Sequence, residues 1–214
     1  MTAHRRLIRR TALAVTAGAA ALVLAACGGS GSGSGGHDMG DMGSMTSDSS
    51  PSATASAKAG AHNAQDVSFA KEMIQHHRQA VDMAELATSR ASAQEVKDLA
   101  TKIKAVQDPE IKTMSGWLTS WGEQVPADMA GMDMSSSMPG AMSSDDMDKL
   151  KKASGTEFDK MFLEMMVKHH EGAVEMAKTQ KADGKYGAAV KLADDVITAQ
   201  TAEIKEMNKM LGKS

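Results

Sequence analysis

The sequence predicts an all-α protein, an antiparallel four-helix bundle made of two repeated helical hairpins and preceded by a signal peptide and a disordered linker. Three observations support this fold class. Aromatic residues make up only 3% of the chain and runs of valine or isoleucine are absent, so strands are not expected. From residue 64 onward, apolar residues recur at helical spacing. A 53-residue pattern also occurs twice, 93 residues apart, with 17 identical positions.

Residues 1–26 are typical of a lipoprotein signal peptide. Four arginines precede an apolar run of small residues, and the run ends in Leu-Ala-Ala followed by Cys27. Cleavage before Cys27 and its acylation would anchor the mature chain to membrane lipid outside the cytoplasm. Cys27 is the only cysteine of the chain, so no disulfide is expected in the fold.

Residues 27–63 are rich in glycine, serine and alanine and are predicted to form a disordered tether. The tether carries a His/Met cluster with His37, Met39 and Met42. Removing the four leader arginines shifts the formal net charge from −3 to −7. An acidic chain of this kind argues against nucleic acid as a partner.

The first repeat, residues 64–122, is predicted to form two helices, over 66–89 and 93–121. Each has an apolar stripe that matches the helical period. Pro109 lies inside the second helix and is expected to kink it or split it locally, because proline lacks a backbone N–H and its ring crowds the preceding turn.

A Met-rich loop, residues 123–144, leads to the second repeat, residues 145–212. A short helix near 145–153, ending at Gly155, is expected to precede helices over 156–182 and 186–211. Two amphipathic hairpins must bury their apolar stripes against each other, which favours one duplicated domain over 64–212.

Each repeat carries a His-His pair on one helix and a Gln-x-x-Glu on the next, at positions where core residues belong. Counted from the hairpin turns, the pairs lie at the same level to within roughly 5 Å, at 1.5 Å of rise per residue. Convergence in mid-bundle predicts a metal centre, and the alternative is a hydrogen-bonded His–Glu network without metal. The candidate ligands are His76, His77, Glu110, His169, His170 and Glu203.

Methionines supply a second set of candidate ligands. Met73 and Met166 stand one helical turn before the histidine pairs and suit either the core or a metal. The loop methionines have no apolar stripe to join, and the alternative there is a low-complexity linker. Thioether sulfur is a soft ligand for Cu(I), and imidazole suits copper in either oxidation state. The exposed candidates are Met129, Met132, Met134, Met138 and Met142 in the loop, and His37, Met39 and Met42 in the tether.

The doubled motif resembles a bacterial family, the "domain of unknown function 305". Both copies share Phe-x-x-x-Met-x-x-His-His-x-x-Ala-Val-x-Met-Ala, and each is followed by Gln-x-x-Glu-Ile-x-x-Met. The resemblance covers about 64–212 and implies a ferritin-like four-helix bundle. Some exported members are implicated in copper binding and copper tolerance. By this resemblance, the site residues carried over are Met73, His76, His77, Met166, His169 and His170.

These observations predict an exported, lipid-anchored metal-binding protein that buffers, chaperones or confers tolerance to copper through paired His and Met ligands. Copper is the expected cofactor, with membrane lipid and other copper-handling proteins as candidate partners. Two alternatives stay open: a ferritin-like redox enzyme acting as a metal oxidase, and a metal-free interaction module. No catalytic motif is found in the sequence, so an enzyme is not the expected class.

Overall fold

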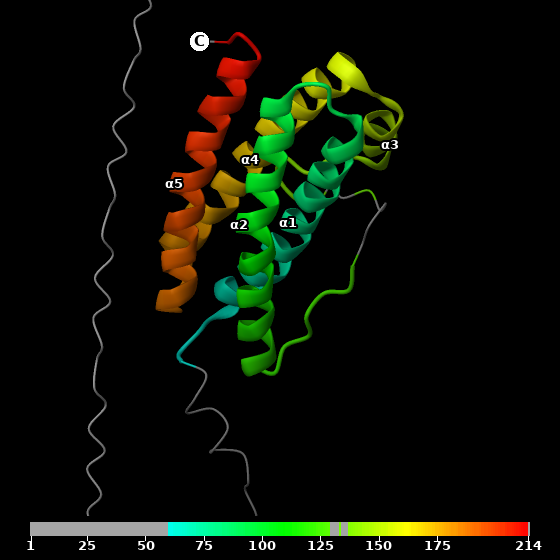
Figure 1. The fold of residues 1–214 in the computed structure, drawn as a ribbon. Coiled ribbons are helices and arrows are strands. Elements are labelled where there is room, and N and C mark those ends of the chain that lie inside the picture. Colours follow the sequence, from blue (N-terminus) through cyan, green and yellow to red (C-terminus); the bar gives the residue numbers. More distant parts are fainter. Residues whose placement is uncertain (1–59, 129–132, 134–136, 214) are drawn as a thin grey trace, which may run out of the picture. The chain divides into compact units, whose positions relative to one another are not determined.

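The computed structural model describes residues 60–128, 133 and 137–213, and this part of the chain is helical without a strand. Helices α1 (Ala64–Arg90) and α2 (Gln94–Ser120) form the first hairpin. The short α3 (Ser144–Lys152) precedes α4 (Gly155–Asp183) and α5 (Gly187–Met210), which form the second hairpin (Figure 1). The predicted all-α bundle of two repeated hairpins is confirmed.

The two hairpins meet mainly through α1 and α4, which run antiparallel and divide the core into two apolar clusters. One cluster joins the second half of α1 to the first halves of α2 and α4, with Ala80, Ile103 and Met166 among its buried members. The other joins the first half of α1 to the second halves of α2 and α4, with Met73 and Met114 among them. The histidine pairs belong to neither cluster and lie between the two.

Pro109 does not split α2, which runs from Gln94 to Ser120 without interruption. Proline removes the bond that its N–H would donate to the carbonyl of Ala105. Ala105 and Pro109 are both exposed, so water can reach the carbonyl left without a helical donor. Of the two expected effects, a kink or a local split, the split does not occur, since the proline lies on the solvent side of a continuous helix.

The ends of the two hairpins are tied together by a pair of buried aspartates at equivalent positions of the repeats. Asp66 completes a capping box with Asn63 at the start of α1. Its carboxylate also accepts the backbone N–H groups of Lys185 and Tyr186 in the α4–α5 turn, at 3.1 and 3.0 Å, and the amide of Gln180 at 2.6 Å. The first helix of repeat 1 therefore caps the turn of repeat 2.

Asp159 makes the reciprocal connection near the start of α4. Its carboxylate accepts the backbone N–H groups of Ser92 and Ala93 in the α1–α2 turn, at 3.0 and 2.9 Å, and also the Ser92 hydroxyl. Gly155, expected at the end of the short helix, instead begins α4 and has a φ of +65°. Each hairpin turn is thus capped by the other hairpin.

The end of the inter-repeat loop is part of the core. Met138 and Met142 are buried, and Met142 packs in the same apolar cluster as Met147 and Leu150 of α3. The expectation that these two methionines are exposed is wrong, because the loop folds back over α1 and α4 before α3 begins. Because they are buried, both methionines contribute to the apolar core of the bundle.

Several candidate residues lie outside the described ranges: Cys27, His37, Met39, Met42, Met129, Met132 and Met134. Among the helices that are described, none combines the length and the apolar character needed to cross a membrane.

Candidate metal centre

Four histidines form a buried layer across the middle of the bundle. His76 and His77 lie on α1, His169 and His170 lie on α4, and all four side chains are essentially inaccessible to solvent. Adjacent side chains on a helix point about 100° apart, so the two histidines of each pair face different neighbouring helices. His76 and His169 face each other between α1 and α4, with ring centroids 3.7 Å apart and a tilt of 38°.

The second histidine of each pair faces the other helix of its own hairpin. His77 Nε2 lies 2.7 Å from Glu110 Oε2 on α2, and His170 Nε2 lies 2.7 Å from Glu203 Oε2 on α5. The equal level of histidine and glutamate, predicted from the hairpin turns, is confirmed in both repeats. The glutamate side chains are only 16% and 18% exposed, so the pairs are largely screened from water.

These contacts determine which ring nitrogen carries the proton. A carboxylate accepts hydrogen bonds, so Nε2–H of His77 and of His170 must be the donor, and the Nδ1 lone pair stays free in a neutral ring. Nδ1 of all four histidines is buried without a hydrogen-bond partner in the described part of the chain. Buried polar nitrogens are rarely left unpaired. Carboxylate–histidine pairs with a free second nitrogen are the usual support for a metal ligand.

The facing histidines are held neutral by their surroundings. Burial, reinforced by the neighbouring His77, lowers the pKa of His76 from 6.5 to about 3, although a hydrogen bond to the Pro139 carbonyl opposes the shift. Burial and the adjacent His76 and His170 also lower the pKa of His169 well below 6.5. Both rings are therefore neutral near pH 7, with one nitrogen lone pair each, which is the form that a metal requires.

Thioethers border the histidine layer on both sides. Met73 and Met166 are fully buried one turn before the histidine pairs, and they fall in different apolar clusters. Residues three or four apart on a helix are surface neighbours, so each sulfur belongs to the same stretch of helix face as its histidines. The sequence predicted this placement of the two methionines.

The four histidines and two glutamates do not converge on one point, contrary to the expectation from the sequence. In the described residues, no three His, Cys, Asp or Glu side chains are arranged to hold a metal ion. Glu110 and Glu203 contact the histidines, which makes them orienting groups in this geometry. Gln107 and Gln200 are buried beside a gap of about 10 Å³ between α2 and α5, and neither side-chain oxygen has a hydrogen-bond partner in the described part of the chain. A gap of that size holds about one water molecule.

One contact at this layer, made by the inter-repeat loop, was not predicted from the sequence. The Pro139 carbonyl accepts a hydrogen bond from His76 Nε2 at 3.0 Å. The loop is held there by Gln79, whose amide donates to the Met142 carbonyl at 3.0 Å and accepts the Met142 N–H at 2.7 Å. A buried glutamine on the helix stripe was the available signal, because a buried amide requires partners.

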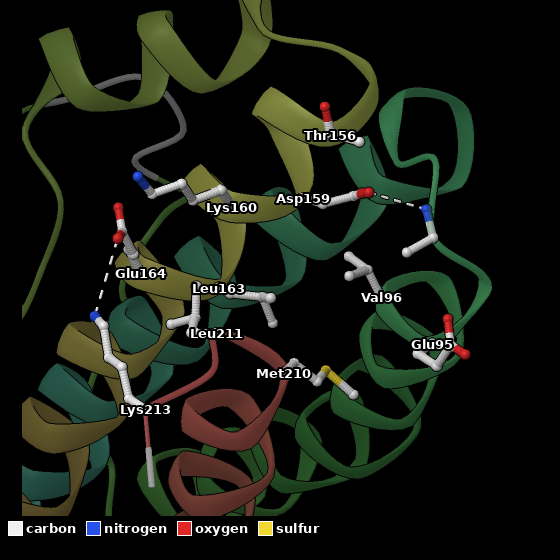
Figure 2. Close-up of a pocket in the computed structure, with 11 residues that line it drawn as sticks. Glu95, Val96, Thr156, Asp159, Lys160, Leu163, Glu164, Met210, Leu211 and Lys213 are labelled. Carbon is white, nitrogen blue, oxygen red and sulfur yellow. Dashed lines mark hydrogen bonds and ion pairs between the residues drawn. The ribbon is translucent and has the colours of Figure 1, made fainter.

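A larger groove lies elsewhere, at the end of the bundle where the α1–α2 turn, the start of α4 and the end of α5 meet. It encloses about 710 Å³ and none of the histidines lines it. Figure 2 shows Leu163, Val96 and Met210 on its apolar side, and Glu164 paired with Lys213 across its edge at 3.9 Å. This groove is separate from the histidine layer.

The fold and this site place the protein in a class of helical bundles that consist of two duplicated hairpins and enclose a layer of buried histidines between methionine-containing apolar clusters. Within that class, the chain belongs to the family described as "Domain of unknown function (DUF305)", whose model matches residues 66–211. Comparison with curated protein sequences gives no match.

Several solved structures share the fold. A putative secreted DUF305 protein from Streptomyces coelicolor is 31% identical, with a TM-score of 0.63, over 70% of this chain and 93% of that one. The protein CopM in its Cu(II)-bound form is 40% identical, with a TM-score of 0.60, over 68% of this chain and 94% of that one. CopM has also been solved in a Cu(I)-bound form, 38% identical with a TM-score of 0.57 over the same shares, and in a silver-bound form.

Proposed function

We propose that this protein binds copper outside the cytoplasm as cargo, in the histidine layer of its bundle, and buffers it or passes it on. The proposal rests on four buried Nδ1 atoms that have no hydrogen-bond partner among the described residues, in a layer bordered by Met73 and Met166. Three of the four rings already donate Nε2–H to an acceptor and would offer Nδ1 to a metal.

The ligand chemistry supports copper over harder metals. Magnesium and calcium prefer carboxylate and carbonyl oxygens, whereas imidazole and thioether groups suit copper, with thioether favouring Cu(I). The two glutamates are engaged by His77 and His170, and no cluster of three His, Cys, Asp or Glu forms within the described residues. A centre that combines His76 and His169 with methionine sulfur fits this arrangement. CopM, which shares the fold, was crystallised with Cu(I), Cu(II) and silver.

The proposed location rests on the leader and on a relative. Residues 1–26 are typical of a signal peptide and Cys27 of a lipidation site, and the Streptomyces coelicolor relative is described as secreted. A lipid on Cys27 would keep the bundle at the outer side of the membrane, tethered by residues 27–63. Replacing Cys27 by alanine should release the protein from membranes or leave it unprocessed, and lipid labelling of the variant would contradict this.

The copper proposal is tested by competition with a Cu(I) chelator on the exported chain, purified in detergent. His76→Ala/His169→Ala should weaken Cu(I) binding by at least 100-fold, since both facing ligands are lost. His62→Ala is the matched control, because His62 stacks on Trp121 away from the layer. Circular dichroism establishes that the variants are folded. Equal Cu(I) affinity of the double variant and the wild type would show that the histidines are a structural network.

A further inference from the structure

The two facing histidines are equivalent in the repeats but not in their surroundings. Residues 138–142, called the strap below, cross the bundle beside His76, and no described residue makes an equivalent hydrogen bond to His169. His76 Nε2 contacts the Pro139 carbonyl of the strap at 3.0 Å. Both ring nitrogens of His169 are buried without a partner among the described residues.

The strap is held at one end by Gln79 of α1. The buried Gln79 side chain accepts a hydrogen bond from the Met142 N–H at 2.7 Å and donates one to the Met142 carbonyl at 3.0 Å. These two hydrogen bonds fix the position of the Met142 backbone and the direction in which the preceding residues run. The position equivalent to Gln79 in the second repeat is Gly172.

Gly172 provides the space that lets the strap reach His76. A Cβ atom at this position of α4 would lie 1.9 Å from the Pro139 oxygen and 2.8 Å from the Gly140 Cα, far inside contact distance. Gly140 has a φ of +71°, and its own Cβ would lie 2.4 Å from the Lys168 carbonyl. The Pro139 carbonyl can therefore meet His76 only because residue 172 has no side chain.

The contact with the strap determines which ring nitrogen of His76 carries the proton. A carbonyl oxygen can only accept, so the proton is on Nε2 and the lone pair of the neutral ring is on Nδ1. We propose that His76 is a pre-oriented Nδ1 ligand for copper, that His169 adapts to the ion, and that Gln79 and Gly172 are positioning residues of the site. This inference rests on the proposed function and adds that the duplicated layer works asymmetrically.

The first test reads the ring directly, in the exported chain carrying ¹⁵N-labelled histidine. Long-range ¹H–¹⁵N spectra separate a protonated ring nitrogen from an unprotonated one, and His76→Gln identifies the His76 signals. The metal-free chain should hold the His76 proton on Nε2, and added Cu(I) should shift the Nδ1 signal. A proton on Nδ1, or a Cu(I) effect on Nε2 alone, would overturn the inference.

The second test disturbs the strap without touching a ligand. Gly172→Ala should weaken Cu(I) binding 10–100-fold, as loss of a supporting contact does in metal sites, and should release His76 from its single tautomer. Gly116→Ala is the matched control, because a Cβ on α2 at residue 116 meets nothing within 4 Å. It should leave both affinity and tautomer unchanged.

The outcomes separate the two proposals. Gly172→Ala with wild-type affinity, or with lower thermal stability but an unchanged tautomer, would reduce the strap to a structural role and overturn the inference. If Gly172→Ala does not fold, Gln79→Met provides the same test, with the same expected direction, since it removes both bonds to Met142. A wild-type chain that binds no Cu(I) would overturn the proposed function, while the tautomer of the metal-free chain still decides whether the strap orients His76.

Discussion

The two hairpins differ least where they hold each other and most where the loop between them lies. Asp66 and Asp159 occupy equivalent positions, and each caps the turn of the opposite hairpin. The His77–Glu110 and His170–Glu203 contacts have the same length. Gln79 and Gly172, in contrast, are equivalent positions with unlike side chains, and both serve the strap. Identities shared by the repeats therefore maintain the bundle, whereas a difference between the repeats sets the environment of the two facing histidines.

The largest effect is expected at the cross-capping aspartates. Asp66→Ala should lower the free energy of unfolding by about 3–5 kcal/mol, because it leaves several buried donors from both hairpins without an acceptor. Asp159→Ala should cost less, since its acceptor bonds all go to one turn. Urea unfolding with unchanged m-values measures the difference. Equal losses would show that the two ends of the bundle are equivalent in stability.

Acid should destabilise the metal-free bundle through both repeats. The pKa of His76 is about 3 and that of His169 is also lowered, whereas unfolded histidines titrate near 6.5. The unfolded chain therefore binds more protons below pH 6.5, and stability falls as the pH decreases from 6.5 toward 3. Between pH 6.5 and 5 the loss from His76 should be about 1.5 kcal/mol, at up to about 1.4 kcal/mol per pH unit, and His169 should add to it in the same direction.

Replacing one facing histidine isolates its share, because His169→Gln should reduce the slope of stability against pH below pH 6.5. Urea unfolding at several pH values gives the slope. An unchanged slope would mean that His169 is not a buried neutral ring in solution.

The glutamates should behave alike in the two repeats. Glu110→Gln and Glu203→Gln each keep an oxygen that accepts the histidine N–H but remove the negative charge of the carboxylate. Each substitution should therefore weaken Cu(I) binding about tenfold. Chelator competition on both variants measures the two effects side by side. A large effect from only one of them would extend the asymmetry of the strap to the second histidine of each pair.

The smallest effect is expected where the repeats differ without consequence for the site. Pro109 of α2 corresponds to Ala202 of α5, and Pro109→Ala restores a helical hydrogen bond on the exposed face. The free energy of unfolding should rise by about 1 kcal/mol, less than the full helix-interior penalty of proline, because water already serves the free carbonyl. Thermal unfolding checks the gain, and a loss of stability would indicate that the proline has a packing role.

Much of the fold was predictable because its signals are local or repeated. The apolar stripes gave the helices, and the repeat gave the hairpins and the level of histidine and glutamate. The strap was not predictable, because its composition resembles a linker and its burial depends on the space at Gly172, a residue far along the chain. The roles of Asp66 and Asp159 were hidden for the same reason, although their identity between the repeats was visible.

The crossed caps also bear on how a duplicated gene could produce this fold. A lone hairpin carries the aspartate that its mate needs and lacks the one that caps its own turn. Two copies would satisfy each other through a self-complementary, twofold symmetric interface, so an ancestral half-length chain would work as a homodimer. In a chain that joins two such copies, the joining segment follows the first repeat only, and here that segment contacts His76.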